Sequence, residues 1–316
     1  MAKAPADSLS LEAIVTRASS INSVTSLLIQ KDGKLLAEHY LGRLNKNETT
    51  NIKSASKSII SLLVGIAINR GDIESVDEPI AQYFEEYFKE NPNPEKEKIT
   101  IKDLLTMRSG LETTSFHNYG RWVVSENWVK FALEQPMEAK PGGDMVYSTG
   151  TSHLLSVILT KATGMSTKAF AEKHLFEPLN IQVGGWDRDP QGYYMGGNNM
   201  ALRPADMLKL GQMVLSGGTY KGQRIVPEQW LNDSFQTYTR SNYNPYDYGY
   251  MWWEKPVGQF KVHFAWGYGG QYIFIVPSLD AVIVLTGNLQ NASQSRSYKD
   301  PVFDLLREEV LPFLES

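Results

Sequence analysis

The run Ser54-Ala55-Ser56-Lys57-Ser-Ile-Ile-Ser-Leu-Leu-Val-Gly-Ile-Ala-Ile-Asn-Arg-Gly, residues 54–71, sets the architecture expected for the whole chain. Its apolar residues fall on nearly every side of a helix, and Gly71 supplies a stop signal. The pattern therefore predicts a helix that begins near Ser54 and is buried all round. Such a helix needs further layers of structure packed against it.

Strand-forming segments lie at both ends of the chain, on either side of this helix. Residues 23–30 and 34–42 are rich in β-forming residues and are joined by Lys31-Asp32-Gly33, which predicts a hairpin. Four more strands are predicted near the C-terminus, at 248–254, 260–266, 271–277 and 281–287. Their short connections favour antiparallel pairing. One sheet could combine the N-terminal hairpin with this C-terminal meander.

Helical segments fill most of the remaining sequence. Residues 72–100 and 178–200 are polar or rich in loop residues. Helices are predicted at 10–19, 101–108, 125–134, 152–163, 167–176, from Pro204, at 227–235 and at 301–314. We therefore expect an α+β fold, with an antiparallel sheet flanked by helices and an inserted all-helical lobe. The expected division is a sheet domain (1–75 plus 201–316) and a mainly helical domain (76–200), with a cleft between them.

Composition excludes several classes of function. The chain has 316 residues, a net charge of −4 and no cysteine, which excludes disulfides, thiolate catalysis and cysteine–zinc sites. An acidic balance does not favour nucleic acid as a partner. No apolar run approaches the ~20 residues of a membrane-spanning helix, and the first residues do not resemble a signal peptide. The compartment stays open: cytoplasmic or, if a leader has been removed, periplasmic or secreted.

Ser54 and Lys57 form a Ser-x-x-Lys pair, and at this spacing their side chains share one face of a helix. A serine hydroxyl becomes a good nucleophile when a base removes its proton. A lysine can be that base when burial lowers its pKa, and the apolar helix offers such burial. Taken alone, the pair fits equally well a serine N-cap followed by a surface lysine.

Two further segments carry candidate site residues. Tyr147 precedes an apolar helix, and its phenol could pass a proton to the leaving group. The segment Trp266-Gly267-Tyr268-Gly269-Gly270-Gln271 lies between two predicted strands, where glycines allow a ligand to approach the backbone. The alternatives are a packed tyrosine and a glycine-rich hairpin turn. The five histidines show no metal-ligand spacing, so we expect neither a metal nor a cofactor.

Together, these elements resemble the serine β-lactamase-like superfamily over roughly residues 23–290, in the branch of class C β-lactamases, family VIII carboxylesterases, D-amino-acid peptidases and 6-aminohexanoate-dimer hydrolases. The resemblance implies Ser54 as nucleophile, Lys57 as base and Tyr147 as proton shuttle. It also implies an oxyanion hole made by the backbone N–H groups of Ser54 and Gln271. Substrate-binding positions are expected at Thr149, Trp266, Tyr268, Gly269, Gly270 and Trp128, with Phe116 as a further candidate for the acyl pocket.

The sequence departs from the pattern of this superfamily at two positions. Thr149 stands where many relatives have asparagine, and Tyr268 stands where β-lactam-active members have a lysine that pairs with the drug's carboxylate. Arg240 could compensate from a nearby loop. Asp187, Arg188 and Asp189 are interpreted as a solvated salt-bridge cluster.

These departures favour a serine hydrolase acting on small, neutral esters or amides, including short peptides, through an acyl-Ser54 intermediate. The alternatives are a β-lactamase or D-amino-acid peptidase, and a non-catalytic sensor that is acylated without turnover. The oligomeric state stays open.

Overall fold

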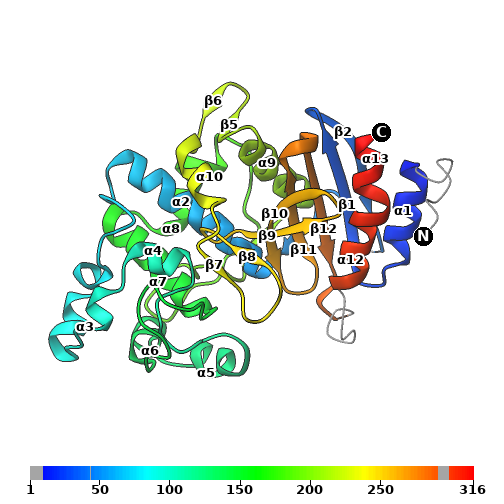
Figure 1. Ribbon diagram of the computed structural model, residues 1–316. Coiled ribbons are helices and arrows are strands. Elements are labelled where there is room, and N and C mark those ends of the chain that lie inside the picture. The colour runs from blue at the N-terminus through cyan, green and yellow to red at the C-terminus, as the bar shows by residue number, and fades with distance from the viewer. Residues whose placement is uncertain (1–9, 43, 291–298) are drawn as a thin grey trace.

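The computed structural model describes residues 10–42, 44–290 and 299–316. Its centre is an eight-stranded antiparallel sheet in the order β2-β1-β12-β11-β10-β9-β8-β7 (Figure 1). The predicted joining of the N-terminal hairpin to the C-terminal meander is confirmed, because β1 pairs with β12 along its length. The strands are β1 Val24–Lys31, β2 Lys34–Tyr40, β7 Thr239–Arg240, β8 Asp247–Tyr248, β9 Trp253–Val257, β10 Phe260–Gly267, β11 Gln271–Val276 and β12 Ala281–Gly287.

The hairpin between β1 and β2 has the turn that its sequence predicts. Asp32 and Gly33 both adopt a positive φ, 50° and 71°. Two positive φ values in a two-residue loop are the geometry of a type I′ turn, whose twist matches that of the strands on either side.

Helix α2, Ser56–Arg70, is the predicted central helix, and every residue from Ser56 to Ala67 is buried. It is preceded by a short 3-10 turn, Lys53–Ala55, so that Ser54 lies just before the α-helix. Gly71 ends the helix in the left-handed conformation, with a φ of 79°. At Gly65 a β-carbon would lie only 2.4 Å from the ring of Trp230, so helix α10, Glu228–Ser234, packs directly on the backbone of α2.

The sheet is covered on both faces. Helix α9, Pro204–Leu215, packs on β11 and β12, where a β-carbon at Gly211 would lie 2.5 Å from Val282. The opposite face carries α1 Leu11–Ser20, α12 Lys299–Leu305 and α13 Leu311–Glu315 (Figure 1). Between α12 and α13 the chain forms a π-helical turn, Leu306–Val310.

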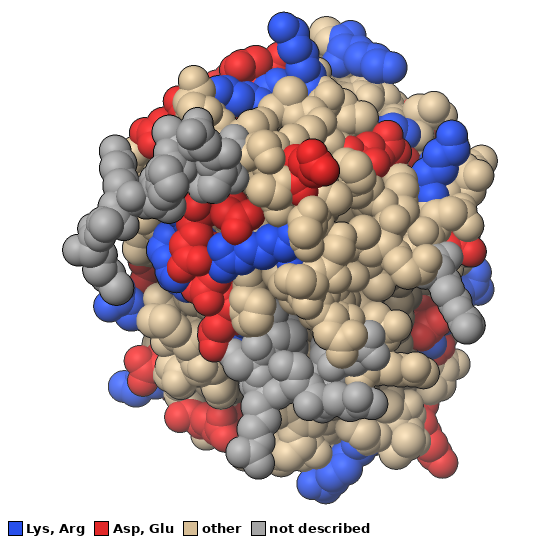
Figure 2. All heavy atoms as spheres, turned by 90° about the vertical axis from the view of Figure 1, so that its right-hand side faces the viewer, with Lys and Arg blue, Asp and Glu red and all other residues tan. Residues whose placement is uncertain are grey.

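Ion pairs connect α1 to the C-terminal segment on the outer surface of these helices. Figure 2 looks at this face and shows acidic and basic side chains next to one another. Arg17 on α1 contacts Glu308 and Glu309, each at 2.8 Å. These contacts are part-exposed, so each contributes a modest stabilisation of about 0.2–1 kcal/mol. They tie the N-terminal helix to the C-terminal segment.

The middle of the chain forms a separate group of helices beside the sheet (Figure 1). These are α3 Glu85–Glu90, α4 Ile101–Leu105, α5 Tyr119–Val123, α6 Trp128–Glu134, α7 Thr149–Thr163 and α8 Thr167–Ala171. Two small ladders complete the fold, β3 Thr50–Asn51 with β4 Ala201–Leu202, and β5 Thr219–Tyr220 with β6 Gln223–Arg224. Helix α7 is the longest of the group and contacts α2, which brings the segment after Tyr147 against the segment after Ser54.

The structure corrects two predictions about elements. The predicted single strand 248–254 is wrong, because the chain reverses at 249–252 and divides it into β8 and β9. A β-carbon at Gly249 would lie 1.9 Å from the Ser234 carbonyl oxygen, and Met251 has a φ of 62°, so both positions belong to a tight turn. The predicted helix 101–108 ends at Leu105, because Met107 is left-handed with a φ of 58°. Across the described ranges, no helix is long and apolar enough to cross a membrane.

Candidate active site

Ser54 and Lys57 meet at the entrance to α2. The Lys57 ammonium donates a hydrogen bond to the Ser54 hydroxyl over 3.1 Å. Lys53, directly before the serine, has a φ of 50°, an uncommon conformation for a residue with a side chain. Such backbone strain is often found at functional sites, where surrounding contacts hold it. The 3-10 turn thus presents Ser54 at the surface of the sheet while Lys57 stays buried.

Lys57 has three polar contacts and little access to water. Besides Ser54, its Nζ donates to the Gly197 carbonyl over 2.7 Å and to the Thr149 hydroxyl over 3.2 Å. The residue is only 1% exposed. Burial lowers the pKa of Lys57 to about 7, since the charged form loses its hydration. At neutral pH a substantial share of the amine is therefore unprotonated and able to accept a proton.

Tyr147 lies beside this pair. The Lys57 Nζ is 5.1 Å from the centroid of the Tyr147 ring. The ring stacks on Trp253 at 5.7 Å and meets Phe116 at 6.2 Å. Its backbone is held by the Thr113 hydroxyl, which donates to the Tyr147 carbonyl over 2.6 Å. The structure thus brings together Ser54, Lys57 and Tyr147, the residues singled out from the sequence.

Thr149 is buried next to Lys57. It is 3% exposed, and its hydroxyl lies 3.2 Å from Lys57 and 2.9 Å from the Ser115 hydroxyl. The Ser115 hydroxyl also accepts the Thr149 N–H. The Thr149 hydroxyl therefore lies between Lys57 and Ser115, and its part in substrate binding stays a prediction. Ser115 was missed, although it ends the conspicuous polar run Glu112-Thr113-Thr114-Ser115.

The hydrogen-bond pattern of the sheet assigns a direction to each N–H near the site. At the β8–β9 turn the Gly249 N–H donates to the Trp252 carbonyl over 2.9 Å. Because bonded pairs alternate along an antiparallel ladder, Trp253 turns its N–H toward β10, where its partner is Phe264.

Continuing this alternation along β10 fixes the directions at its end. By this alternation the Trp266 N–H is on the side of β9, and Gly267 pairs with Gln271 on β11. Gln271 is the first residue of β11 and pairs with Gly267. Its side chain is also fully buried and donates to the Gly287 carbonyl. The contribution of the Gln271 N–H to an oxyanion hole stays a prediction.

The glycine-rich turn between β10 and β11 is shaped by packing. Gly269 and Gly270 have positive φ values of 88° and 94°. A β-carbon at Gly269 would lie 2.6 Å from the Leu289 side chain. Both glycines are buried, whereas Tyr268 is 51% exposed and stands at the rim. Trp266 stacks on Tyr272, on the sheet face covered by Phe303.

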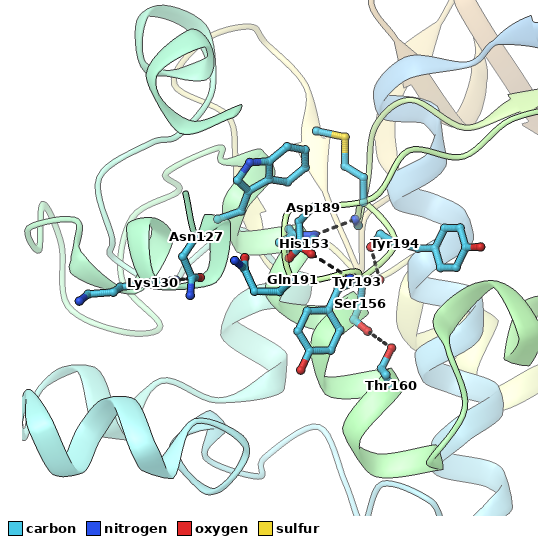
Figure 3. A network of polar contacts seen from close by, with 12 residues as sticks. Asn127, Lys130, His153, Ser156, Thr160, Asp189, Gln191, Tyr193 and Tyr194 are labelled. Carbon is cyan, nitrogen blue, oxygen red and sulfur yellow. Dashed lines mark hydrogen bonds and ion pairs between the residues drawn. The ribbon is translucent and has the colours of Figure 1, made fainter. Parts of the chain in front are cut away.

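Trp128, expected in the acyl pocket, packs inside the helical lobe. It is 7% exposed, and its ring lies 4.9 Å from Trp122 and 5.6 Å from His153. The role of Trp128 in the acyl pocket stays a prediction. The expectation of a solvated cluster at 187–189 is wrong for Asp189, because its side chain is fully buried and 3.0 Å from His153 (Figure 3).

Besides Lys57, two cationic side chains are considered as possible partners for a negatively charged substrate, Lys53 and Arg240. Lys53 is half-buried, its Nζ is 3.2 Å from Asn199 Oδ1, and burial lowers its pKa. Arg240 is 76% exposed and pairs with Asp247 at 3.2 Å.

A cavity of about 290 Å3 opens elsewhere, in the helical lobe, with Tyr87, Lys130 and Tyr193 among its lining residues. None of Ser54, Lys57 and Tyr147 lines it, so it is separate from the site.

The family model described as Beta-lactamase matches residues 19–306 of this chain. The chain belongs to the Beta-lactamase family. The resemblance drawn from the sequence motifs is thereby confirmed.

Known members of the Beta-lactamase fold resemble the chain across most of its length. A 6-aminohexanoate-dimer hydrolase from Paenarthrobacter ureafaciens is 22% identical over 310 residues, which cover 87% of this chain and 76% of that protein. A solved structure from Bacillus anthracis, provisionally assigned as a 6-aminohexanoate-dimer hydrolase, has a TM-score of 0.79 at 18% identity, covering 95% of this chain and 81% of its own. A solved hydrolase with promiscuous acyltransferase activity has a TM-score of 0.75 at 16% identity, covering 94% of this chain and 99% of its own. The homologues of this Beta-lactamase family member thus include hydrolases, and its fold is that of β-lactamases and penicillin-binding proteins.

Proposed function

We propose that this protein is a serine hydrolase that cleaves esters or amides of small substrates through an acyl-Ser54 intermediate. One observation carries the proposal: the buried Lys57 amine, with a pKa lowered to about 7, lies 3.1 Å from the Ser54 hydroxyl. A base poised near neutral pH within hydrogen-bond reach of a hydroxyl is what general-base activation of a nucleophile requires.

In the proposed first step, the neutral Lys57 amine takes the Ser54 proton as the hydroxyl oxygen attacks the substrate carbonyl. The carbonyl becomes an oxyanion, and Ser54 forms its new bond to carbon. Tyr147, whose ring lies 5.1 Å from the Lys57 Nζ, relays the proton to the leaving alcohol or amine. As that proton arrives, the bond between the carbonyl carbon and the leaving group breaks and the carbonyl re-forms, which leaves the acyl-enzyme. Water then attacks the acyl carbon and gives a proton to Lys57. The bond from that carbon to the Ser54 oxygen breaks, the acid leaves, and Ser54 regains its proton.

For the oxyanion hole we propose the Ser54 N–H, at the start of the helical segment, together with an N–H from the end of β10. The candidates are Trp266, near the end of β10, and Tyr268, directly after it, since the pairing of β10 with β9 ends at Phe264. Backbone donors fixed in this way stabilise the developing charge without reorganising during the reaction.

The proposed site lies between the two parts of the chain expected from the sequence. Ser54 and Lys57 come from the sheet part, 1–75 plus 201–316, and Tyr147 and Thr149 come from the helical part, 76–200. Tyr268 stands half-exposed at the rim, and a tyrosine can donate a hydrogen bond but carries no fixed positive charge. This favours neutral substrates over β-lactams that bear a carboxylate.

The test is labelling with a phosphonate probe that reacts with activated serine hydroxyls, followed by intact mass spectrometry and peptide mapping. We expect one adduct on Ser54 and none in Ser54→Ala. Steady turnover of a chromogenic short-chain ester, lost in Ser54→Ala, supports the enzyme. A stoichiometric burst without turnover supports the acylated sensor instead. The 6-aminohexanoate dimer, the compound in the name of the relative from Paenarthrobacter ureafaciens, tests amide cleavage when its hydrolysis product is followed by mass spectrometry.

A further inference from the structure

A buried polar chain runs from the helical lobe to the proposed base. Asp189 Oδ2 is 3.0 Å from His153 Nε2, and both side chains are fully buried. Figure 3 shows the two residues against each other, between α7 and the loop that carries Tyr193 and Tyr194. Asp189 Oδ1 accepts the Tyr193 N–H over 2.8 Å, so the carboxylate is held on two sides. The rings of Trp122 and Trp128 pack against the imidazole at 5.8 and 5.6 Å and exclude water from it.

The other imidazole nitrogen faces the segment that holds Lys57. His153 Nδ1 accepts the Gly196 N–H over 3.2 Å. Since Nδ1 must offer its lone pair to this N–H, the ring proton lies on Nε2, toward Asp189. The Ser152 hydroxyl fixes the same glycine from the opposite direction, because it donates to the Gly196 carbonyl over 2.6 Å.

Gly197 transmits this restraint directly to Lys57. Its carbonyl accepts the Lys57 Nζ over 2.7 Å, the shortest of that nitrogen's three hydrogen bonds. Its φ is 96°, and a β-carbon would lie 2.5 Å from both the Lys57 Cγ and the Ser152 Oγ. The backbone of 196–197 is therefore wedged between α7 and the lysine stem, with no room for a side chain.

These contacts determine where the neutral amine aims its lone pair. A neutral lysine nitrogen has two N–H bonds and one lone pair. Gly197 O and Thr149 Oγ1 accept the two N–H bonds, which leaves the lone pair for the Ser54 hydroxyl. A shift of the Gly197 carbonyl would let the amine rotate away from that hydroxyl.

We propose that His153, oriented by Asp189, is a positioning residue that sets the Lys57 amine for proton abstraction through Gly196 and Gly197. This inference rests on the proposed function, and it goes beyond it because neither residue is placed to touch the substrate. Four other titratable or charged groups lie on the surrounding elements. The Tyr147 ring lies against Lys57, and the Tyr119 hydroxyl accepts a hydrogen bond from Asn198. Lys53 and Asp187 each form a hydrogen bond with Asn199.

Two amide substitutions separate this role from simple packing. Asn places its amide oxygen near the position of Nδ1, so His153→Asn keeps an acceptor for the Gly196 N–H and loses the contact with Asp189. Gln places its amide near the position of Nε2, so His153→Gln keeps a partner for Asp189 and orphans the Gly196 N–H. If positioning runs through Gly196, the Gln variant is the impaired one. If the buried pair matters only for stability, the Asn variant is impaired at least as much.

The measurement is the rate of Ser54 acylation by the phosphonate probe as a function of pH. For His153→Gln we expect the plateau rate to fall at least about tenfold, because small misplacements of a catalytic group are costly. We expect His153→Asn to stay within about threefold of wild type. Loss of the Gly197 carbonyl removes an acceptor that stabilises the ammonium form, so the pKa of Lys57 falls. The acid limb of the pH–rate profile, where the labelling rate rises as Lys57 loses its proton, should therefore move to lower pH in His153→Gln.

Controls keep the outcomes distinct. Trp122→Phe disturbs the same packing around His153 and should lower the melting temperature while leaving the acid limb unchanged. If His153→Gln does not fold, Ser152→Ala loosens Gly196 from its other side and should change rate and limb in the same directions. The positioning role is overturned if the plateau labelling rate, or the pH of the acid limb, stays at the wild-type value in His153→Gln (or in Ser152→Ala, where that variant is used instead). It is also overturned if His153→Asn lowers the labelling rate as much as His153→Gln does. Failure of the wild-type protein to label at Ser54 would instead overturn the proposed function.

Discussion

The buried lysine gives a prediction about stability that is independent of any substrate. In the unfolded chain Lys57 has an ordinary pKa of 10.5, and burial lowers it to about 7 in the folded protein. Between these values the unfolded state binds one more proton than the folded state, so wild-type stability rises with pH. The slope from this group is about 1.4 kcal/mol per pH unit. Lys57→Met, which keeps an unbranched side chain but cannot be charged, removes this slope.

The perturbation is therefore measured as a difference between the two proteins. Integrating between pH 7.5 and 9.5 with the two pKa values, wild type should gain about 2.5 kcal/mol of unfolding free energy relative to Lys57→Met. Near pH 7 the variant escapes the cost of burying an ammonium but loses the contacts with Ser54, Thr149 and Gly197. The stability of wild type relative to Lys57→Met therefore rises with pH across this range.

The assay is urea unfolding at pH 7.5, 8.5 and 9.5, followed by the fluorescence of the seven tryptophans. Subtracting the variant from the wild type cancels the titration of every other group. If the two stabilities run parallel across this range, Lys57 keeps its proton in the folded state. It could then not serve as a base near neutral pH, and the mechanism proposed for Ser54 would fail.

Further outcomes follow from the same structure. Ester turnover should rise with pH through about 7, because Lys57 must lose its proton to act as base. Tyr147→Phe should lower turnover by about 10² or more with Ser54 labelling retained, and near-wild-type turnover would contradict the proton relay. A chromogenic cephalosporin should be hydrolysed weakly or not at all, and rapid hydrolysis would show that another cation, such as Lys53, replaces the missing lysine. Gly65→Ala should lower the free energy of unfolding by about 1–3 kcal/mol, because its β-carbon meets the Trp230 ring. Gly120→Ala, where nothing lies within 4 Å of the new atom, is the matched control and should be neutral or stabilising.

The elements with strong local signals could be located from the sequence. The buried helix with its glycine stop, the Asp32-Gly33 turn and the strands β10, β11 and β12 follow from local periodicity and turn chemistry. Where the prediction was wrong, the competing force was tertiary. The residues of 248–254 have the β-forming character of one strand, but Gly249 packs against the Ser234 carbonyl and the chain must reverse there.

What the sequence determined by itself is the identity of the groups that can do chemistry. Ser-x-x-Lys at the start of an apolar helix fixes a hydroxyl and an amine on one face, because helix geometry alone sets that spacing. The tertiary structure decided how those groups are held: Thr149 and Gly197 accept hydrogen bonds from Lys57, and Asp189 lies buried against His153. These contacts join residues tens of positions apart or depend on the register of paired strands. Local sequence carries no record of them, since they form only when α2, α7 and the 189–197 loop pack together.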